Sequence, residues 1–304
     1  MKLDRRAFLS TSFKALALSA APQHRIRFAT SGYIWHANIE EGIRTSAQFG
    51  FQGIEPFREH ILKYLDRPQQ LKKQLDAAGI SLVTCSNGGN MSVDFIDPVR
   101  VPPTIDDHVR FIRDFITPFG CRHFKINLGR RPQDGPTSEQ LKIMAGALNE
   151  LGKRTSQLGL RLAPHPHIWS PLEREPELRR VMELTDPEFV YLVTDTAHLT
   201  LGGMNPLRIM TDYFSRIAAV HFKDAAPKYR DYRGTTPTRE EHRKANLYKN
   251  LGAGGVDFPE SWVCLGDGTT PAGLRWILIR RAPAKARSRK IWRSTRSTCE
   301  RCSG

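Results

Sequence analysis

The chain has 304 residues, enough for one large domain with a full hydrophobic core. Hydrophobic residues make up 39% and charged residues 25%, which is ordinary for a globular protein, and no long apolar run indicates a membrane span. The formal net charge is +15, but residues 266–304 hold ten Lys or Arg and two Asp or Glu, which accounts for +8 of it. The five cysteines are odd in number and irregularly spaced, which argues against a disulfide framework.

Residues 1–24 contain the pair Arg5-Arg6, followed by Phe8-Leu9, a mild apolar stretch and small residues at 19–21. This pattern resembles a twin-arginine export signal, so we expect a periplasmic protein. The alternative is a disordered tail on a cytoplasmic enzyme.

Residues 25–260 alternate between short apolar runs and amphipathic stretches, many of which end at a glycine. Such alternation predicts a parallel sheet covered by helices. Seven units in about 230 residues favour a closed (β/α)8 TIM barrel over an open sheet, and no Gly-rich phosphate loop follows the early strands. The expected strands are 25–35, 53–57, 80–86, 123–128, 160–167, 190–199 and 217–223, and the expected helices are 39–49, 68–78, 104–119, 138–158, 173–184, 206–214 and 239–251.

Polar side chains stand at the carboxyl ends of these strands, where such barrels place their active sites. Residues two apart on a strand share a face, so His165 and His167 can both point into the barrel mouth, as can His221 and Lys223. Neutral imidazole and ionised carboxylate are the ligands that divalent metals need, so the group predicts a metal centre. Its members are Glu55, His165, His167, Asp195, His198, His221, Lys223 and Asp224.

Less specific explanations exist for single members of this group. Glu55 could form an ion pair or cap a helix, and Asp195 could cap the turn after its strand. The remaining histidines are interpreted as ordinary polar residues: His24, His36, His60, His108, His123 and His242.

Five segments, taken in chain order, resemble the xylose isomerase-like sugar phosphate isomerase/epimerase superfamily, including its inosose dehydratase-like and tagatose epimerase-like members. Each motif is weak alone, but five in order at strand ends cover residues 25–259 and favour the family. The segments are 50–55, 163–167, 195–199 with Gly202-Gly203, 221–224 and 252–258.

The resemblance implies a divalent metal (manganese, cobalt, magnesium or zinc) held by His165, Asp195 and His221. The family usually has a glutamate where His165 stands, and a second glutamate after the eighth strand. Because both glutamates also act as acid and base in the epimerases, this two-carboxylate shuttle is in doubt here. His165, His167 and Lys223 are then the candidate catalytic residues, and Glu55, His198 and Lys223 the candidate substrate-binding residues.

The implied function is an isomerase or epimerase that removes a proton from a sugar or cyclitol hydroxy-ketone and forms an enediolate. A dehydratase on the same substrates is the alternative, and a sugar-binding barrel without activity is a further one. An endonuclease IV-like hydrolase on this fold would need more strand-end carboxylates. The expected partner is a small sugar or cyclitol, with no nucleic acid or membrane, and the chain is expected to associate as a homo-oligomer.

Residues 261–304 do not match the family, which has a helix, an acidic strand end and a final helix there. The segment is basic and lacks an amphipathic stripe, so the eighth βα unit is expected to be aberrant or missing and the barrel open on one side. A reading-frame shift explains the difference: with a one-base offset, the codons of residues 275–279 permit valine, aspartate, leucine and aspartate. A disordered basic tail, or an arm for nucleic acid or membrane surfaces, is the alternative.

Overall fold

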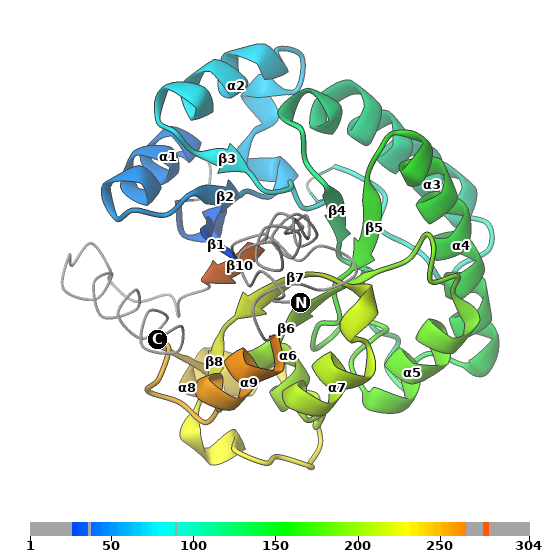
Figure 1. Cartoon of the computed structure of the whole chain (residues 1–304). Coiled ribbons are helices and arrows are strands. Elements are labelled where there is room, and N and C mark those ends of the chain that lie inside the picture. Colours follow the sequence, from blue (N-terminus) through cyan, green and yellow to red (C-terminus); the bar gives the residue numbers. More distant parts are fainter. Residues whose placement is uncertain (1–25, 36–37, 89, 266–275, 280–304) are drawn as a thin grey trace, which may run out of the picture.

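A computed structural model describes residues 26–35, 38–88, 90–265 and 276–279 (Figure 1). The expected export signal and most of residues 261–304 lie outside these described residues. Among the helices of the described part, none combines the length and hydropathy that a membrane crossing requires.

Eight parallel strands form the central ring, with helices packed outside it (Figure 1). Six of them pair in the order β3-β2-β1-β10-β7-β6, and β4 pairs with β5. A parallel bridge between Leu162 and Val190 connects the β5 and β6 regions. The ring strands are β1 (Arg27–Ser31), β2 (Gly53–Glu55), β3 (Ser81–Leu82), β4 (His123–Ile126), β5 (Arg161–Pro164), β6 (Leu192–Asp195), β7 (Ile217–Phe222) and β10 (Trp276–Ile279).

The helices follow the strands along the chain, as the βα pattern predicts. A short antiparallel pair, β8 (Asp224–Ala225) and β9 (Tyr248–Lys249), lies beyond β7. The α-helices are α1 (Ile39–Gln48), α2 (Pro68–Ala77), α3 (Val101–Phe111), α4 (Ser138–Gln157), α5 (Glu175–Leu184), α6 (Thr196–Leu201), α7 (Pro206–Asp212), α8 (Arg239–Ala245) and α9 (Phe258–Leu265).

Two expected elements have other bounds in the structure. The strand expected at 190–199 ends at Asp195, because its Oδ1 accepts the backbone N–H groups of Ala197 and His198 and so begins α6. The helix expected at 239–251 ends at Ala245, and the chain then forms β9.

The eighth barrel position is filled. Strand β10 pairs in parallel with β1 on one side and with β7 on the other, so the expectation that the barrel is open at this position is wrong. A run of four apolar residues, Trp276–Ile279, is enough to provide a buried strand. Strand β10 departs from the family pattern in its composition, because it has no carboxylate.

The barrel interior is narrow and mostly lined by small side chains. Trp276 and Leu278 of β10 pack there against Ala29, Ala163 and Ala219, which come from β1, β5 and β7. The larger aliphatic and aromatic side chains lie between the ring and the helices. The upper end of the barrel, where the strands terminate, is therefore the part of the interior that carries polar groups.

Candidate metal centre

Three buried side chains converge at the carboxyl ends of β5, β6 and β7. His165 directly follows β5, Asp195 ends β6, and His221 lies near the end of β7. Asp195 and His221 are register partners in the β6–β7 pair, which sets them side by side. One ligand atom from each residue lies within 4.8 Å of the other two, and all three residues are 0% exposed. The residues predicted as metal ligands are thus brought together.

The charge states of these side chains suit metal binding. Burial lowers the pKa of His165 well below its usual value, so this imidazole is neutral at pH 7. Burial by itself raises the pKa of Asp195, but its interactions with His198, His165 and His221 outweigh burial and hold the pKa well below the usual value. The Oδ2 atom of Asp195 lies 3.7 Å from a ring nitrogen of both His165 and His221.

These residues fit a divalent cation. Within the described part of the chain, both ring nitrogens of His165 and Nδ1 of His221 are buried without a hydrogen-bond partner. Burying a polar atom in this way is costly unless a partner binds it. Two imidazole nitrogens and one carboxylate are a common donor set for zinc, manganese or cobalt, and three protein ligands leave a coordination position for substrate.

Glu55, at the end of β2, is buried against the cluster. The residue is 0% exposed, and its Oε2 is 3.0 Å from Nε2 of His221. Its Oε1 accepts hydrogen bonds from Lys125 Nζ at 3.0 Å and from Ser86 Oγ at 3.2 Å. Because the carboxylate only accepts, Nε2 of His221 carries the proton and Nδ1 presents the lone pair to the cluster. These contacts are those of the ion pair considered for Glu55 in the sequence. The substrate contact expected for Glu55 stays a prediction.

Lys125 and Ser86 were not singled out in the sequence. Lys125 is fully buried, and its Nζ also donates to Ser86 Oγ at 2.6 Å. A lysine between Phe124 and Ile126 in a strand buried on both faces is the pattern that could have indicated a buried ion pair.

A second polar group borders the cluster on the solvent side. The rings of His167 and His198 lie 3.5 Å apart between centroids, and Lys223 Nζ is 3.2 Å from Nε2 of His198. The Lys223 ammonium also lies 3.3 Å from the centre of the Tyr248 ring. Tyr248 was overlooked because it falls within the helix expected at 239–251.

The tautomers of this second group follow from its hydrogen bonds. His167 Nδ1 donates to the carbonyl of Ile168 at 2.5 Å, so Nε2 is its basic nitrogen. Burial, His167 and Lys223 lower the pKa of His198 well below its usual value, so His198 is neutral. Because an ammonium has no lone pair, Lys223 donates to Nε2 of His198.

Asp224 belongs to the fold and not to the metal cluster. Its carboxylate accepts the backbone N–H groups of Gly252, Gly254 and Val256 at 2.8–3.1 Å. A Cβ on Gly254 would lie 2.0 Å from the carbonyl of Ala225, so the close turn requires glycine there. The motif at 252–258 therefore closes a loop over the end of β7.

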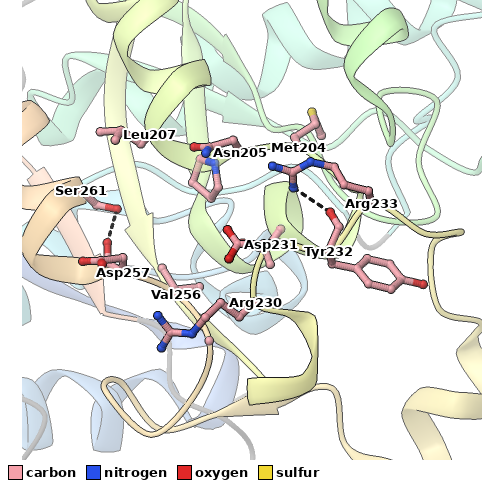
Figure 2. Close-up of a pocket in the computed structure, with 13 residues that line it drawn as sticks. Met204, Asn205, Leu207, Arg230, Asp231, Tyr232, Arg233, Val256, Asp257 and Ser261 are labelled. Carbon is pink, nitrogen blue, oxygen red and sulfur yellow. Dashed lines mark hydrogen bonds between the residues drawn. The ribbon is translucent and has the colours of Figure 1, made fainter.

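A separate pocket of about 270 Å³ lies between the start of α7 and the segment after β8 (Figure 2). Asn205, Arg230, Asp231 and Asp257 line it, so cations and carboxylates are mixed. It shares no residue with the metal cluster.

The fold and the buried His/Asp cluster define a TIM-barrel enzyme with a metal-type site at the ends of its strands. The sequence model described as xylose isomerase-like TIM barrel matches residues 43–262, and the chain belongs to that family. An inosose dehydratase from Lacticaseibacillus casei is 27% identical over 273 residues, 82% of this chain and 84% of that protein.

Two solved structures show the same fold. The 3-keto-D-glucoside 4-epimerase YcjR from E. coli has a TM-score of 0.69 at 16% identity and covers 91% of this chain and 100% of its own. The IOLI protein, whose structure contains a bound zinc atom, has a TM-score of 0.70 at 13% identity, with 91% and 98% covered. The chain is thus a sugar-modifying enzyme of the isomerase, epimerase or lyase kind.

Proposed function

We propose that the chain is a metal-dependent dehydratase acting on a cyclitol or sugar that carries a ketone beside hydroxyl-bearing carbons. The observation that carries this proposal is the buried convergence of His165, Asp195 and His221 next to the imidazoles of His167 and His198. The similarity in sequence to an inosose dehydratase favours water loss over the isomerisation expected first.

The chemistry requires a proton to leave the carbon next to the ketone. A divalent cation held by His165, Asp195 and His221 would act as a Lewis acid toward the ketone oxygen. His167 is the base, because its hydrogen bond to Ile168 leaves Nε2 as the basic nitrogen beside the cluster. The Lys223 ammonium stabilises the negative charge that develops on the substrate oxygen.

In the second step the proton held by His167 leaves with the substrate hydroxyl as water. The C–H electron pair forms the new carbon–carbon double bond, and the bond from the next carbon to its hydroxyl breaks. The proton on His167 passes to the departing hydroxide, which leaves as water, and His167 is neutral again. If the proton instead returned to the same carbon from the other face, the enzyme would be an epimerase.

The test uses 2-keto-myo-inositol in D₂O with added Mn²⁺, Co²⁺ or Zn²⁺, followed by NMR. A dehydratase gives an unsaturated product and one water per turnover, and an epimerase gives a deuterated epimer. If the ketone binds but neither reaction occurs, the result supports the sugar-binding barrel without activity. If the ketone does not bind and loses neither a proton nor water, the result contradicts the proposal.

The base is tested with His167→Asn. The Asn amide keeps the donor to the Ile168 carbonyl but removes the basic nitrogen. We expect kcat to fall by roughly 10²–10⁴-fold with little change in substrate affinity. His60→Asn, at a buried histidine that does not contact the metal cluster in the described hydrogen bonds, is the control and keeps its activity.

A further inference from the structure

Trp169 has an unusual backbone conformation just beyond His167. Its φ is +67°, in the left-handed region that bulky residues rarely adopt. The conformation is held by three hydrogen bonds: the Trp169 N–H donates to Glu173 Oε2 at 2.5 Å, its carbonyl accepts from the Arg131 N–H at 3.0 Å, and its indole N–H donates to the Pro237 carbonyl at 2.8 Å. Backbone strain that is held in this way is characteristic of functional sites.

Glu173 and Arg131, which hydrogen-bond to the backbone of Trp169, are held in place by ion pairs. Glu173 is only 6% exposed, and its Oε1 lies 3.4 Å from Nε of Arg131. Arg131 also makes two hydrogen bonds to Glu177, at 2.6 and 2.9 Å. This network joins the loop after β4 to the loop after β5, so the position of the indole does not depend on its own loop alone.

The indole continues a series of rings that leads outward from the metal cluster. The ring centroids of His165 and His167 are 5.5 Å apart, those of His167 and Trp169 are 6.3 Å apart, and those of Trp169 and His242 are 5.9 Å apart. His165 is fully buried, whereas His167 and Trp169 are partly exposed. Arg239 covers the indole, its Cζ lying 4.5 Å from the ring centre. The half-buried aromatic surface therefore lies where a molecule bound at the cluster would extend.

We propose that Trp169 forms an apolar wall of the substrate site and selects six-membered rings over open-chain ketoses. This inference rests on the proposed function, since it places the reacting ketone at the metal cluster. One face of a cyclitol or pyranose ring presents C–H groups, which pack on a rigid indole, while the hydroxyls on its rim reach polar groups such as His198 and Lys223. An open chain of four carbons has no such face.

The test replaces Trp169 by glycine, the residue that its φ favours. Trp169→Gly keeps or raises the Tm because the backbone strain is relieved, whereas a merely structural tryptophan would lower it. The KM for 2-keto-myo-inositol rises 10–100-fold, and the KM for erythrulose, a four-carbon ketose that cannot close a six-membered ring, changes less than threefold. Trp169→Tyr keeps a flat ring and stays within a few-fold of the unchanged enzyme.

Asp231→Gly is the matched control, because Asp231 also has a positive φ (+53°) but lies at the separate pocket. We expect it to affect Tm in the same direction with no change in either KM. An equal change for the two ketoses in Trp169→Gly, or no change, would overturn the inference while leaving the dehydratase proposal intact. If the unchanged chain binds neither ketose by calorimetry, both proposals are overturned.

Discussion

At the scale of single residues, three imidazoles around the metal cluster, those of His221, His167 and His198, have their proton placed by a neighbour. Glu55 accepts from Nε2 of His221, the Ile168 carbonyl accepts from Nδ1 of His167, and Lys223 donates to Nε2 of His198. These partners are a carboxylate, a backbone carbonyl and an ammonium, each of which allows only one direction of donation. The nitrogen that faces the site is therefore determined before any ligand binds.

Glu55→Gln tests this placement at His221. An amide can donate or accept, so it no longer fixes the tautomer, and it leaves the buried Lys125 ammonium without its anion. We expect affinity for Zn²⁺ or Mn²⁺ to fall by about 10–100-fold and the unfolding free energy to fall by about 3–5 kcal/mol. Competition with a chromogenic chelator and urea unfolding measure the two quantities.

The double variant Glu55→Gln with Lys125→Met separates the two effects. Removing both charges restores much of the stability, because no uncompensated charge stays buried. Metal affinity remains low, since His221 still lacks its carboxylate. Recovery of metal affinity in the double variant would show that Glu55 acts only through stability.

The sequence allowed the candidate ligand residues to be predicted but not the residues that support them. His165, Asp195 and His221 stand at strand ends, where the βα pattern places the mouth of a barrel. Glu55 also ends a strand, but its contact with His221 joins residues 166 positions apart and depends on how β2 and β7 approach across the interior. The local sequence pattern contains no information about the distance between Glu55 and His221.

At the scale of elements, buried histidines link α3 and β4 to the core. His108 on α3 uses Nδ1 and Nε2 for the Thr104 carbonyl and the Asn87 amide, and burial lowers its pKa to about 4. His123 opens β4, and burial likewise lowers its pKa to about 4. The two contacts of His108 require its neutral ring, because Nδ1 donates to the carbonyl of Thr104 while Nε2 accepts from the Asn87 amide.

Stability should therefore fall as the pH drops from about 6.5 to 4. In this window the unfolded histidines, with a pKa near 6.5, bind protons that the folded ones do not, so the unfolding free energy decreases with falling pH. For one such histidine the loss at pH 5 is about 2 kcal/mol. Urea unfolding at pH 7.5, 6.5, 5.5 and 5.0 measures it.

His108→Gln isolates the contribution of that histidine. Glutamine offers both a donor and an acceptor but does not titrate, so the variant loses less stability than the unchanged chain between pH 7.5 and 5.0. Carboxylates titrate similarly in both proteins and cancel in the difference. Parallel profiles would mean that His108 takes up its proton equally well in the folded state.

The boundary of the strand expected at 190–199 depended on side-chain hydrogen bonds that periodicity does not reveal. The run from Val190 to Leu199 contains no Gly or Pro to mark an end, so it resembles one long strand. Asp195 interrupts it by using Oδ1 to begin α6, while Oδ2 faces the metal cluster. The two explanations considered for Asp195, a helix cap and a candidate metal ligand, thus concern different oxygens of one carboxylate.

At the scale of the whole molecule, the ring is completed by a strand whose sequence does not suit its position. Register pairs Leu278 of β10 with His221 of β7 and with Ala29 of β1. The family resemblance implies a carboxylate ligand from this strand, but an aliphatic side chain stands there. The alternation of strands and helices in the sequence predicted seven βα units. It could not predict the eighth strand, because residues 261–304 lack that alternation.

We propose that the reading-frame shift predicted from the sequence causes this mismatch. In the offset frame the second aspartate falls at the junction of residues 278 and 279, next to the position that faces His221. We expect sequencing of the gene's 3′ end from independent isolates to show a one-base difference before or near Cys264, with an acidic strand end downstream. An unchanged frame in all isolates would contradict the prediction.

A single substitution tests whether β10 can supply the missing carboxylate ligand. Leu278 is fully buried and packs inside the barrel, whereas Ile277 is buried on the outer face against the cluster that contains Val220 and Phe222. Leu278→Glu places a carboxylate beside His221, so we expect affinity for Mn²⁺ or Zn²⁺ to rise at least about tenfold.

Without metal, Leu278→Glu is less stable than the unchanged chain, because burying a carboxylate without a partner is unfavourable. Saturating metal recovers that loss, since binding to the folded state alone adds stability in proportion to the logarithm of metal concentration over Kd. Ile277→Glu is equally destabilised but gains no metal affinity, because its side chain points away from the cluster. Thermal unfolding of both variants with and without metal compares them directly, and equal responses to metal would show that β10 does not border the metal site.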